Sequence, residues 1–208
     1  MMQPAPIVFV VDDDASVRRS LSRLLKSAGY QVEMFASAGD FLASGRHRES
    51  PACLVLDLRM PGLTGMELQV RLRELESTLA IVFITGHGDI PTSVRAIKGG
   101  AVDFLPKPFD DTALLDAVAR AVAQTREDGR ARAELGALQD RFAKLTARER
   151  EVMAQIVTGK LNKQVAEKLG TVEKTIKVHR ARIFEKMQVQ SLAELVPLAV
   201  KLGLLDSH

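Results

Sequence analysis

The sequence of 208 residues predicts an α/β domain with a doubly wound (βα)5 parallel sheet, followed by a helical linker and a small all-α domain. Three observations lead to this fold class. Short apolar runs alternate with amphipathic helical patterns over about the first 120 residues, as in successive βα units. The apolar pattern then fades over residues 124–134, where the chain is almost entirely polar or alanine. Short helical patterns separated by glycine fill the remaining part.

The first domain is predicted to contain five strands with helices between them. Several of the strand candidates are apolar on both faces, which is typical of central strands covered by helices on both sides. The first helix is expected to start near Asp14 and to end at Gly29, and Asp110 or Asp111 can cap the last helix. The predicted strands comprise residues 7–11, 30–35, 53–56, 81–84 and 102–105.

The second domain opens with a capping box, in which the Thr146 hydroxyl accepts from a backbone N–H while the Glu149 side chain reaches back. Gly159 and Gly170 separate the helical patterns that follow, and Asn162 is a suitable N-cap. The predicted helices comprise residues 147–158, 162–169, 173–187 and 191–202. We therefore expect domains at residues 1–123 and 143–208, joined by a helical linker at 124–142 that can bend near Gly129.

Composition and charge narrow the class of protein. Apolar residues make up 46% of the chain and charged residues 26%, which excludes a disordered or fibrous protein. No apolar run is long enough to cross a bilayer and the chain start lacks a signal-peptide pattern, so we expect a soluble cytoplasmic protein. Residues 1–140 hold 16 Lys and Arg against 19 Asp and Glu, whereas residues 141–208 hold 13 against 7. The second domain is therefore the part expected to bind a polyanion.

Reactive side chains follow four of the predicted strands. Asp12 and Asp13 follow the first strand, Asp57 the third, Thr85 the fourth and Lys107 the fifth. In a doubly wound sheet these strand ends share the edge where ligands bind. The three carboxylates form an oxygen cluster suited to Mg²⁺, because without a cation they would repel one another. A carboxylate beside Mg²⁺ can attack a phosphoryl group, with Lys107 as a second positive contact and the Thr85 hydroxyl as a hydrogen-bond donor.

These stretches, at residues 10–14, 56–62, 84–86 and 104–109, resemble the receiver domain of two-component response regulators, which has a flavodoxin-like fold. The resemblance implies that Asp57 is the phosphoacceptor for a sensor histidine kinase. Phe104 fits both a switch role and the core of a strand. By this resemblance the Mg²⁺ ligands are Asp12, Asp13, Asp57 and the backbone carbonyl of Arg59, and the phosphoryl contacts and switch residues are Thr85, Lys107 and Phe104.

Two enzyme classes fit the acidic site less well. A phosphatase of the haloacid dehalogenase type needs a second Asp two residues after its nucleophile, where this chain has Arg59. A dinucleotide-binding enzyme needs a glycine fingerprint, which Gly86 and Gly88 begin but no third glycine completes. Neither class explains the basic second domain. We therefore expect a regulator and not an enzyme.

The basic domain is predicted to contain a helix-turn-helix, with helices at residues 162–169 and 173–187 and the second helix as the reader of DNA. Together with residues 145–152, this segment resembles LuxR-type domains, and with the receiver it gives the NarL/FixJ family. The chain departs from that family at Val172, where a serine usually caps the recognition helix, and Thr171 can cap one position earlier. The resemblance implies base contacts by Lys177 and Val178 and phosphate contacts near Lys163, Lys174, Thr175 and Arg180.

The last predicted helix has more apolar positions than a small core needs, so we expect it to form a dimer contact through Leu192, Leu195, Val196 and Ala199. Pro197 must kink this helix or lie in its first turn. The expected function is a response regulator that is phosphorylated on Asp57, dimerises, binds promoter DNA and activates transcription, with RNA polymerase as a further partner. The alternative is a phosphorylation-independent DNA-binding regulator whose receiver serves only as a dimerisation module.

Overall fold

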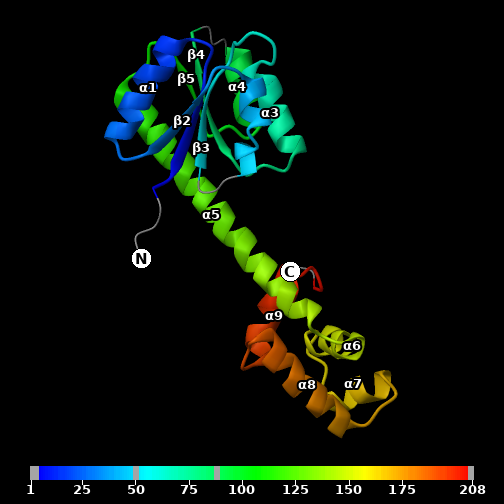
Figure 1. The fold of residues 1–208 in the computed structure, drawn as a ribbon. Coiled ribbons are helices and arrows are strands. Elements are labelled where there is room, and N and C mark those ends of the chain that lie inside the picture. The colour runs from blue at the N-terminus through cyan, green and yellow to red at the C-terminus, as the bar shows by residue number, and fades with distance from the viewer. Residues whose placement is uncertain (1–4, 49–51, 87–89, 206–208) are drawn as a thin grey trace. The chain divides into compact units, whose positions relative to one another are not determined.

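The computed structural model describes residues 5–48, 52–86 and 90–205, and the chain divides into two compact units, residues 1–130 and 131–208. The first unit is the predicted α/β domain, with helices on both sides of a sheet (Figure 1). The second unit is all-helical. Each unit has its own hydrophobic core.

The sheet of the first unit contains five parallel strands in the order β2-β1-β3-β4-β5, so the expected doubly wound topology is confirmed. All five predicted strands agree with the structure to within one residue at each end, because short continuous apolar runs bounded by turn residues are typical of strands buried on both faces. The strands are β1 (Ile7–Val11), β2 (Gln31–Phe35), β3 (Ala52–Asp57), β4 (Ala80–Thr85) and β5 (Asp103–Pro106). The helices are α1 (Ala15–Ser27), α2 (Ala38–Ala43), the 3₁₀ turn η1 (Arg46–Arg48), α3 (Gly65–Glu74), α4 (Ile90–Lys98) and α5 (Asp111–Ala143).

Strand alternation divides the α/β core into two layers. In β1, Phe9 and Val11 point into the layer that holds α2, α3 and α4, while Val8 and Val10 point into the layer that holds α1 and α5. All four side chains have no exposed surface, as expected for a central strand covered on both faces. The carboxyl ends of the strands are thereby held at one edge of a rigid sheet.

Helix α5 begins after Asp110, whose side chain accepts a hydrogen bond from Thr112 N at 2.8 Å. Of the two expected N-cap residues, Asp110 is therefore the one that caps α5. The helix includes the residues that we expected to form a linker, and Gly129 lies within it without interrupting it. Leu138 and Phe142, near its end, pack against the core of the second unit.

The second unit contains α6 (Ala147–Ile156), α7 (Asn162–Lys168), α8 (Glu173–Met187) and α9 (Leu192–Lys201). The capping box at Thr146 and Glu149 is confirmed. Two expected caps are wrong: Leu161 and Val172 occupy the N-cap positions of α7 and α8 instead of Asn162 and Thr171, and neither supplies a side-chain cap.

Pro197 lies beyond the first turn of α9, so the expectation that it could mark that turn is wrong. Among the helices of the described residues, none has the length and apolar character needed to span a membrane.

Candidate functional site

The carboxyl edge of the parallel sheet brings together side chains from four different strand ends. In the strand register, Val11 pairs with Leu56, Asp57 with Ile84, and Thr85 with Pro106, so the residues that follow these strands are neighbours. The backbone N–H of Lys107 donates to the Thr85 carbonyl at 2.7 Å, which fixes the start of the β5–α5 loop against β4.

Lys107 links the two buried carboxylates of this edge. Its Nζ lies 2.7 Å from Asp12 Oδ2 and 2.8 Å from Asp57 Oδ1. The Asp12 side chain is 1% exposed and that of Asp57 8%, so both ion pairs are shielded from water. The second oxygen of Asp57 accepts from the backbone N–H of Arg59 at 2.8 Å. Sequence positions 12, 57 and 107 therefore form one site.

The charges of this site are not balanced, because two buried carboxylates share one ammonium. Burial raises the pKa of the Asp57 carboxyl above its usual value, even though the Lys107 ammonium and the Arg59 N–H act in the opposite direction. Burial acts to lower the pKa of Lys107, but its hydrogen bonds to Asp12 and Asp57 outweigh this, so its pKa is raised. The site therefore retains surplus negative charge that a cation would relieve.

Asp13, which we expected to group with Asp12 and Asp57, makes no contact with Lys107 in the described residues, and its role as a Mg²⁺ ligand stays a prediction. Its side chain is exposed, and among the described residues no group of three or more His, Cys, Asp or Glu side chains is arranged to hold a metal ion. Within the cluster the single Lys107 ammonium lies between Asp12 and Asp57, so one of the two buried negative charges stays unbalanced. Oxygen donors for a hard cation are nevertheless present in Asp12, Asp57 and the carbonyl of Arg59.

Two residues that hold this site in place were missed by the sequence reasoning. Arg18 Nη1 donates to the Asp12 carbonyl at 2.5 Å. Gly65 begins α3, and a Cβ atom there would lie 2.4 Å from the Asp57 carbonyl oxygen. The capping box formed by Thr64 and Glu67 has the sequence pattern that marks a helix start, so this glycine could have been identified in advance.

The proposed switch residues lie beside the acidic site. Thr85 ends β4 and is 1% exposed. Phe104 in β5 is partly buried against the α3–α4 layer, with its ring centroid 6.3 Å from that of Phe83. The Lys107–Pro108 bond is cis. His87, which the sequence places near this site, lies outside the described residues.

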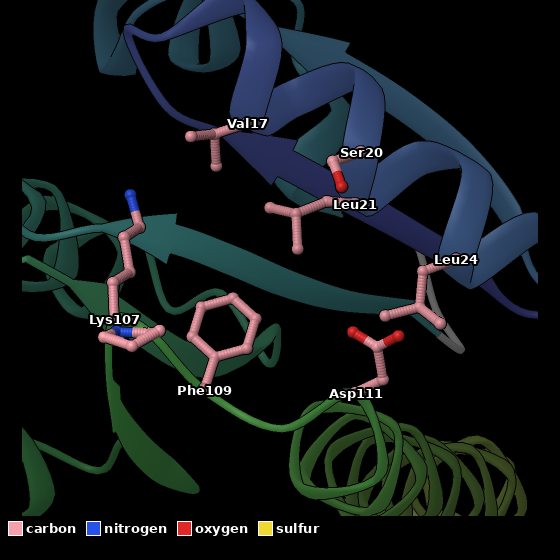
Figure 2. Close-up of a pocket in the computed structure, with 8 residues that line it drawn as sticks. Val17, Ser20, Leu21, Leu24, Lys107, Phe109 and Asp111 are labelled. Carbon is pink, nitrogen blue, oxygen red and sulfur yellow. The ribbon is translucent and has the colours of Figure 1, made fainter.

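A pocket of about 270 Å³ opens beside Lys107, between α1 and the β5–α5 loop. Figure 2 shows Val17, Leu21 and Leu24 of α1 on one side and Phe109 on the other. The pocket is thus mainly apolar, with a Lys107 side chain at its border that also contacts Asp57.

The helix-turn-helix of the second unit is formed by α7, a turn at Gly170 with φ +62°, and α8. Lys174, Lys177 and Val178 share one exposed face of α8, and Val178 is 45% exposed. The Lys177 ammonium lies 3.2 Å from the Glu173 carboxylate, one turn earlier on the same helix. Lys163 on α7 is also exposed, and Thr175 is partly exposed.

Arg180 occupies a different position from the other predicted DNA contacts. Its Nη1 donates to Asn162 Oδ1 at 3.0 Å, and its guanidinium lies 5.6 Å from the ring centroid of Phe184. It is only partly exposed and ties the start of α7 to α8. This tie also gives Asn162 a role other than the expected N-cap.

The predicted dimer contact on α9 is wrong for two of its four residues. Leu195 and Ala199 are 0% exposed and belong to the core of the second unit, so in this fold they cannot contact a second copy. Leu192 and Val196 are partly buried against the same core. Part of the apolar excess of this helix is therefore used inside the domain, and a dimer contact through Leu192 and Val196 stays a prediction.

Comparison with known proteins agrees with this geometry. The family model of the response regulator receiver domain matches residues 8–119, and that of the bacterial regulatory proteins of the luxR family matches residues 143–199. The chain belongs to the two-component response regulators with a LuxR-type DNA-binding domain. As a response regulator it is a transcriptional regulator and not an enzyme.

Relatives of this regulator cover nearly its whole length. Nodulation protein W of Bradyrhizobium diazoefficiens is 48% identical over 97% of this chain and 88% of that protein. The low-resolution structure of the response regulator StyR is 50% identical, covers 95% of this chain and 99% of its own, and gives a TM-score of 0.86. Full-length FixJ from B. japonicum is 42% identical, covers 99% and 100%, and gives a TM-score of 0.58.

Proposed function

We propose that this response regulator is a phosphorylation-dependent transcription factor whose phosphoacceptor is Asp57. The observation that carries the proposal is the buried site in which Lys107 contacts both Asp12 and Asp57. An Asp57 carboxylate oxygen attacks the phosphorus of a kinase phosphohistidine, the P–N bond breaks, and the leaving imidazole keeps the electron pair. In this proposal Lys107 and the hydroxyl of Thr85 contact the oxygens of the acyl phosphate that forms.

We propose Mg²⁺ as the cofactor of this step, since the donors are oxygens only and the buried carboxylates outnumber the nearby cation. Asp12, Asp57 and the Arg59 carbonyl would hold the ion, and the exposed Asp13 could turn to join them. When bound, the ion supplies positive charge to the oxygens of the transferring phosphoryl group. The pocket beside Lys107 offers a docking place for the kinase helix.

The output we propose is dimerisation and binding to promoter DNA. Helix α4 presents Ile90, Val94 and Ile97 on one stripe, with exposed fractions of 80%, 44% and 46%, which supports a receiver contact between two copies. Pairing two receivers raises the effective concentration of the two DNA-reading helices, which contact DNA through Lys163, Lys174, Thr175, Lys177 and Val178. We propose further that the bound regulator activates transcription, with RNA polymerase as a partner. Residues 124–142 connect the two domains in this proposal.

The decisive experiment compares the wild type with Asp57→Asn in a phosphorylation assay with acetyl phosphate and Mg²⁺. We expect the wild type to gain one phosphoryl group by intact mass spectrometry and the variant to gain none. Asp116→Asn, an exposed carboxylate on α5, is the matched control and should label normally. Undiminished labelling of Asp57→Asn would refute the assignment of the site.

The same exposed stripe of α4 favours a second candidate, in which the receiver dimerises without phosphorylation. The two candidates differ in one measurement, the affinity for DNA with and without acetyl phosphate and Mg²⁺. A rise in affinity for the wild type that is absent in Asp57→Asn supports the first candidate. Equal affinity in both conditions, with a dimer already present, supports the second.

A further inference from the structure

A groove between α3 and α4 of the receiver lies outside the phosphoacceptor site. It has a volume of about 300 Å³ and is formed by one stripe of α3, at positions i, i+3, i+4 and i+7, and by the last turn of α4. Its lining residues are Met66, Gln69, Val70, Arg73, Arg95, Lys98 and Gly99. No acidic residue is among them.

The three basic side chains of this groove have no acidic partner among the residues that the structure describes. Arg73, Arg95 and Lys98 are exposed, and none of them forms an ion pair with another residue that the structure describes. Arg95 only donates to the Thr92 hydroxyl, at 3.2 Å. The groove therefore concentrates positive charge in a domain whose net charge is negative.

The adjoining surface of α3 provides a contrast within the same helix. A neighbouring hollow of about 440 Å³ shares Met66 and Val70 with the groove, but its charged residues are Arg71, Glu67 and Glu74. Arg71 Nη1 lies 3.1 Å from Glu74 Oε2, so its charge is balanced locally. The unbalanced positive charge is thus a property of the α3–α4 groove and not of α3 as a whole.

The floor of the groove is already formed. Gln69 is 5% exposed, and its Nε2 donates to the Ala96 carbonyl of α4 at 3.0 Å. A Cβ atom at Gly99 would lie 2.6 Å from Gln69 Oε1, so the two helices touch closely here. Met66 and Val70 line the apolar part, and Val70 is 42% exposed.

We propose that this groove binds an acidic amphipathic helix of a partner protein. The apolar side chains of such a helix would cover Met66 and Val70, and its carboxylates would pair with Arg73, Arg95 and Lys98. A nucleic acid backbone supplies the negative charge but has no apolar groups to cover the floor, so it fits less well. The surface borders the α4 stripe of Ile90, Val94 and Ile97 proposed for dimerisation: Arg95 lies on another side of that helix, whereas Lys98, one turn after Val94, lies at the boundary between the two surfaces.

The test uses the full-length protein and two designed helical peptides with identical Leu and Met positions, flanked by Glu in one and by Lys in the other. Fluorescence anisotropy at low salt measures binding. We expect the acidic peptide to bind at least about tenfold more tightly than the basic one, with affinity that falls as salt rises. The combined substitution of Arg73→Glu and Arg95→Glu should weaken the acidic peptide by about tenfold or more, because like charges would then face each other.

Arg71→Glu is the matched control, since it reverses a charge on the same helix but in the balanced hollow, and it should change peptide affinity less than about twofold. Phosphorylation of Asp57 is measured for every variant and should be unchanged, which separates this proposal from the proposed function. Equal binding of both peptides, no binding by either, or an equal loss with Arg71→Glu would overturn the proposal. So would a loss of affinity for random duplex DNA in the Arg73→Glu, Arg95→Glu protein, because the groove would then be a DNA contact.

Discussion

Lys107→Met tests whether the acidic site is held together by one shared ammonium. At an effective dielectric constant of about 20, an ion pair at 2.7 or 2.8 Å amounts to about 6 kcal/mol of attraction, much of which is offset by the cost of burying the charges. Removing one partner of a buried pair costs about 3–5 kcal/mol. Since the Lys107 side chain is 24% exposed, we expect a loss near the lower limit, about 3 kcal/mol.

The pH dependence of the free energy of unfolding of Lys107→Met follows from the carboxylates that remain in the site. Burial already raises the pKa of Asp57, and without Lys107 this pKa rises further. The folded state then binds more protons than the unfolded state, so its free energy of unfolding falls as pH rises from the unfolded carboxyl pKa of about 4 towards the folded value. The deficit against the wild type should therefore be small in acid and largest at neutral pH.

Urea unfolding followed by Tyr30 fluorescence measures this effect. Tyr30 is the single tyrosine of a chain without tryptophan, and it packs against the receiver core, so its signal follows the receiver alone. Added Mg²⁺ should restore more stability to Lys107→Met than to the wild type, because no ammonium opposes the cation. Lys26→Met, at an exposed lysine of α1, is the control. A loss below about 1 kcal/mol at neutral pH, with the same response to Mg²⁺ as the wild type, would refute the reasoning.

Three further substitutions test other parts of the molecule. Gly65→Ala should slow phosphorylation and destabilise the receiver by about 1–3 kcal/mol, because its Cβ would meet the Asp57 carbonyl; normal labelling and stability would contradict this close approach. Glu149→Gln should destabilise the second domain by about 1–3 kcal/mol, measured by circular dichroism, because Glu149 is 2% exposed and accepts from Lys186 at 2.6 Å. Burial acts to raise the pKa of Glu149, but Lys186 holds this pKa below its usual value. The stability that the Glu149–Lys186 pair adds should therefore vanish as pH falls through the lowered pKa. If Glu149→Gln were less stable than the wild type by the same amount down to acid pH, the ion pair would not be the cause. Lys177→Ala should weaken binding to a duplex selected by the wild type about tenfold and to random duplex much less, whereas an equal loss on both would show a phosphate contact.

Patterns among residues that are close in the sequence predict most of the fold of this response regulator. Five apolar runs of strand length, each followed by a helical pattern, are sufficient to predict a parallel sheet, and the Thr146 capping box predicts the start of α6. The order of Asp12, Asp57 and Lys107 at strand ends also predicts their meeting, because parallel strands end at one edge of the sheet. These features depend on residues close in sequence or on a topological rule, so they can be predicted from the sequence alone.

Tertiary structure decided how these side chains share charge and space. Only the folded site shows Lys107 between Asp12 and Asp57 with Asp13 outside, since ion pairing depends on distances that spacing along the chain does not encode. In the same way, the apolar pattern of α9 predicts an apolar face but not what covers it. Packing of the helices in the second unit, and not a second copy, buries Leu195 and Ala199.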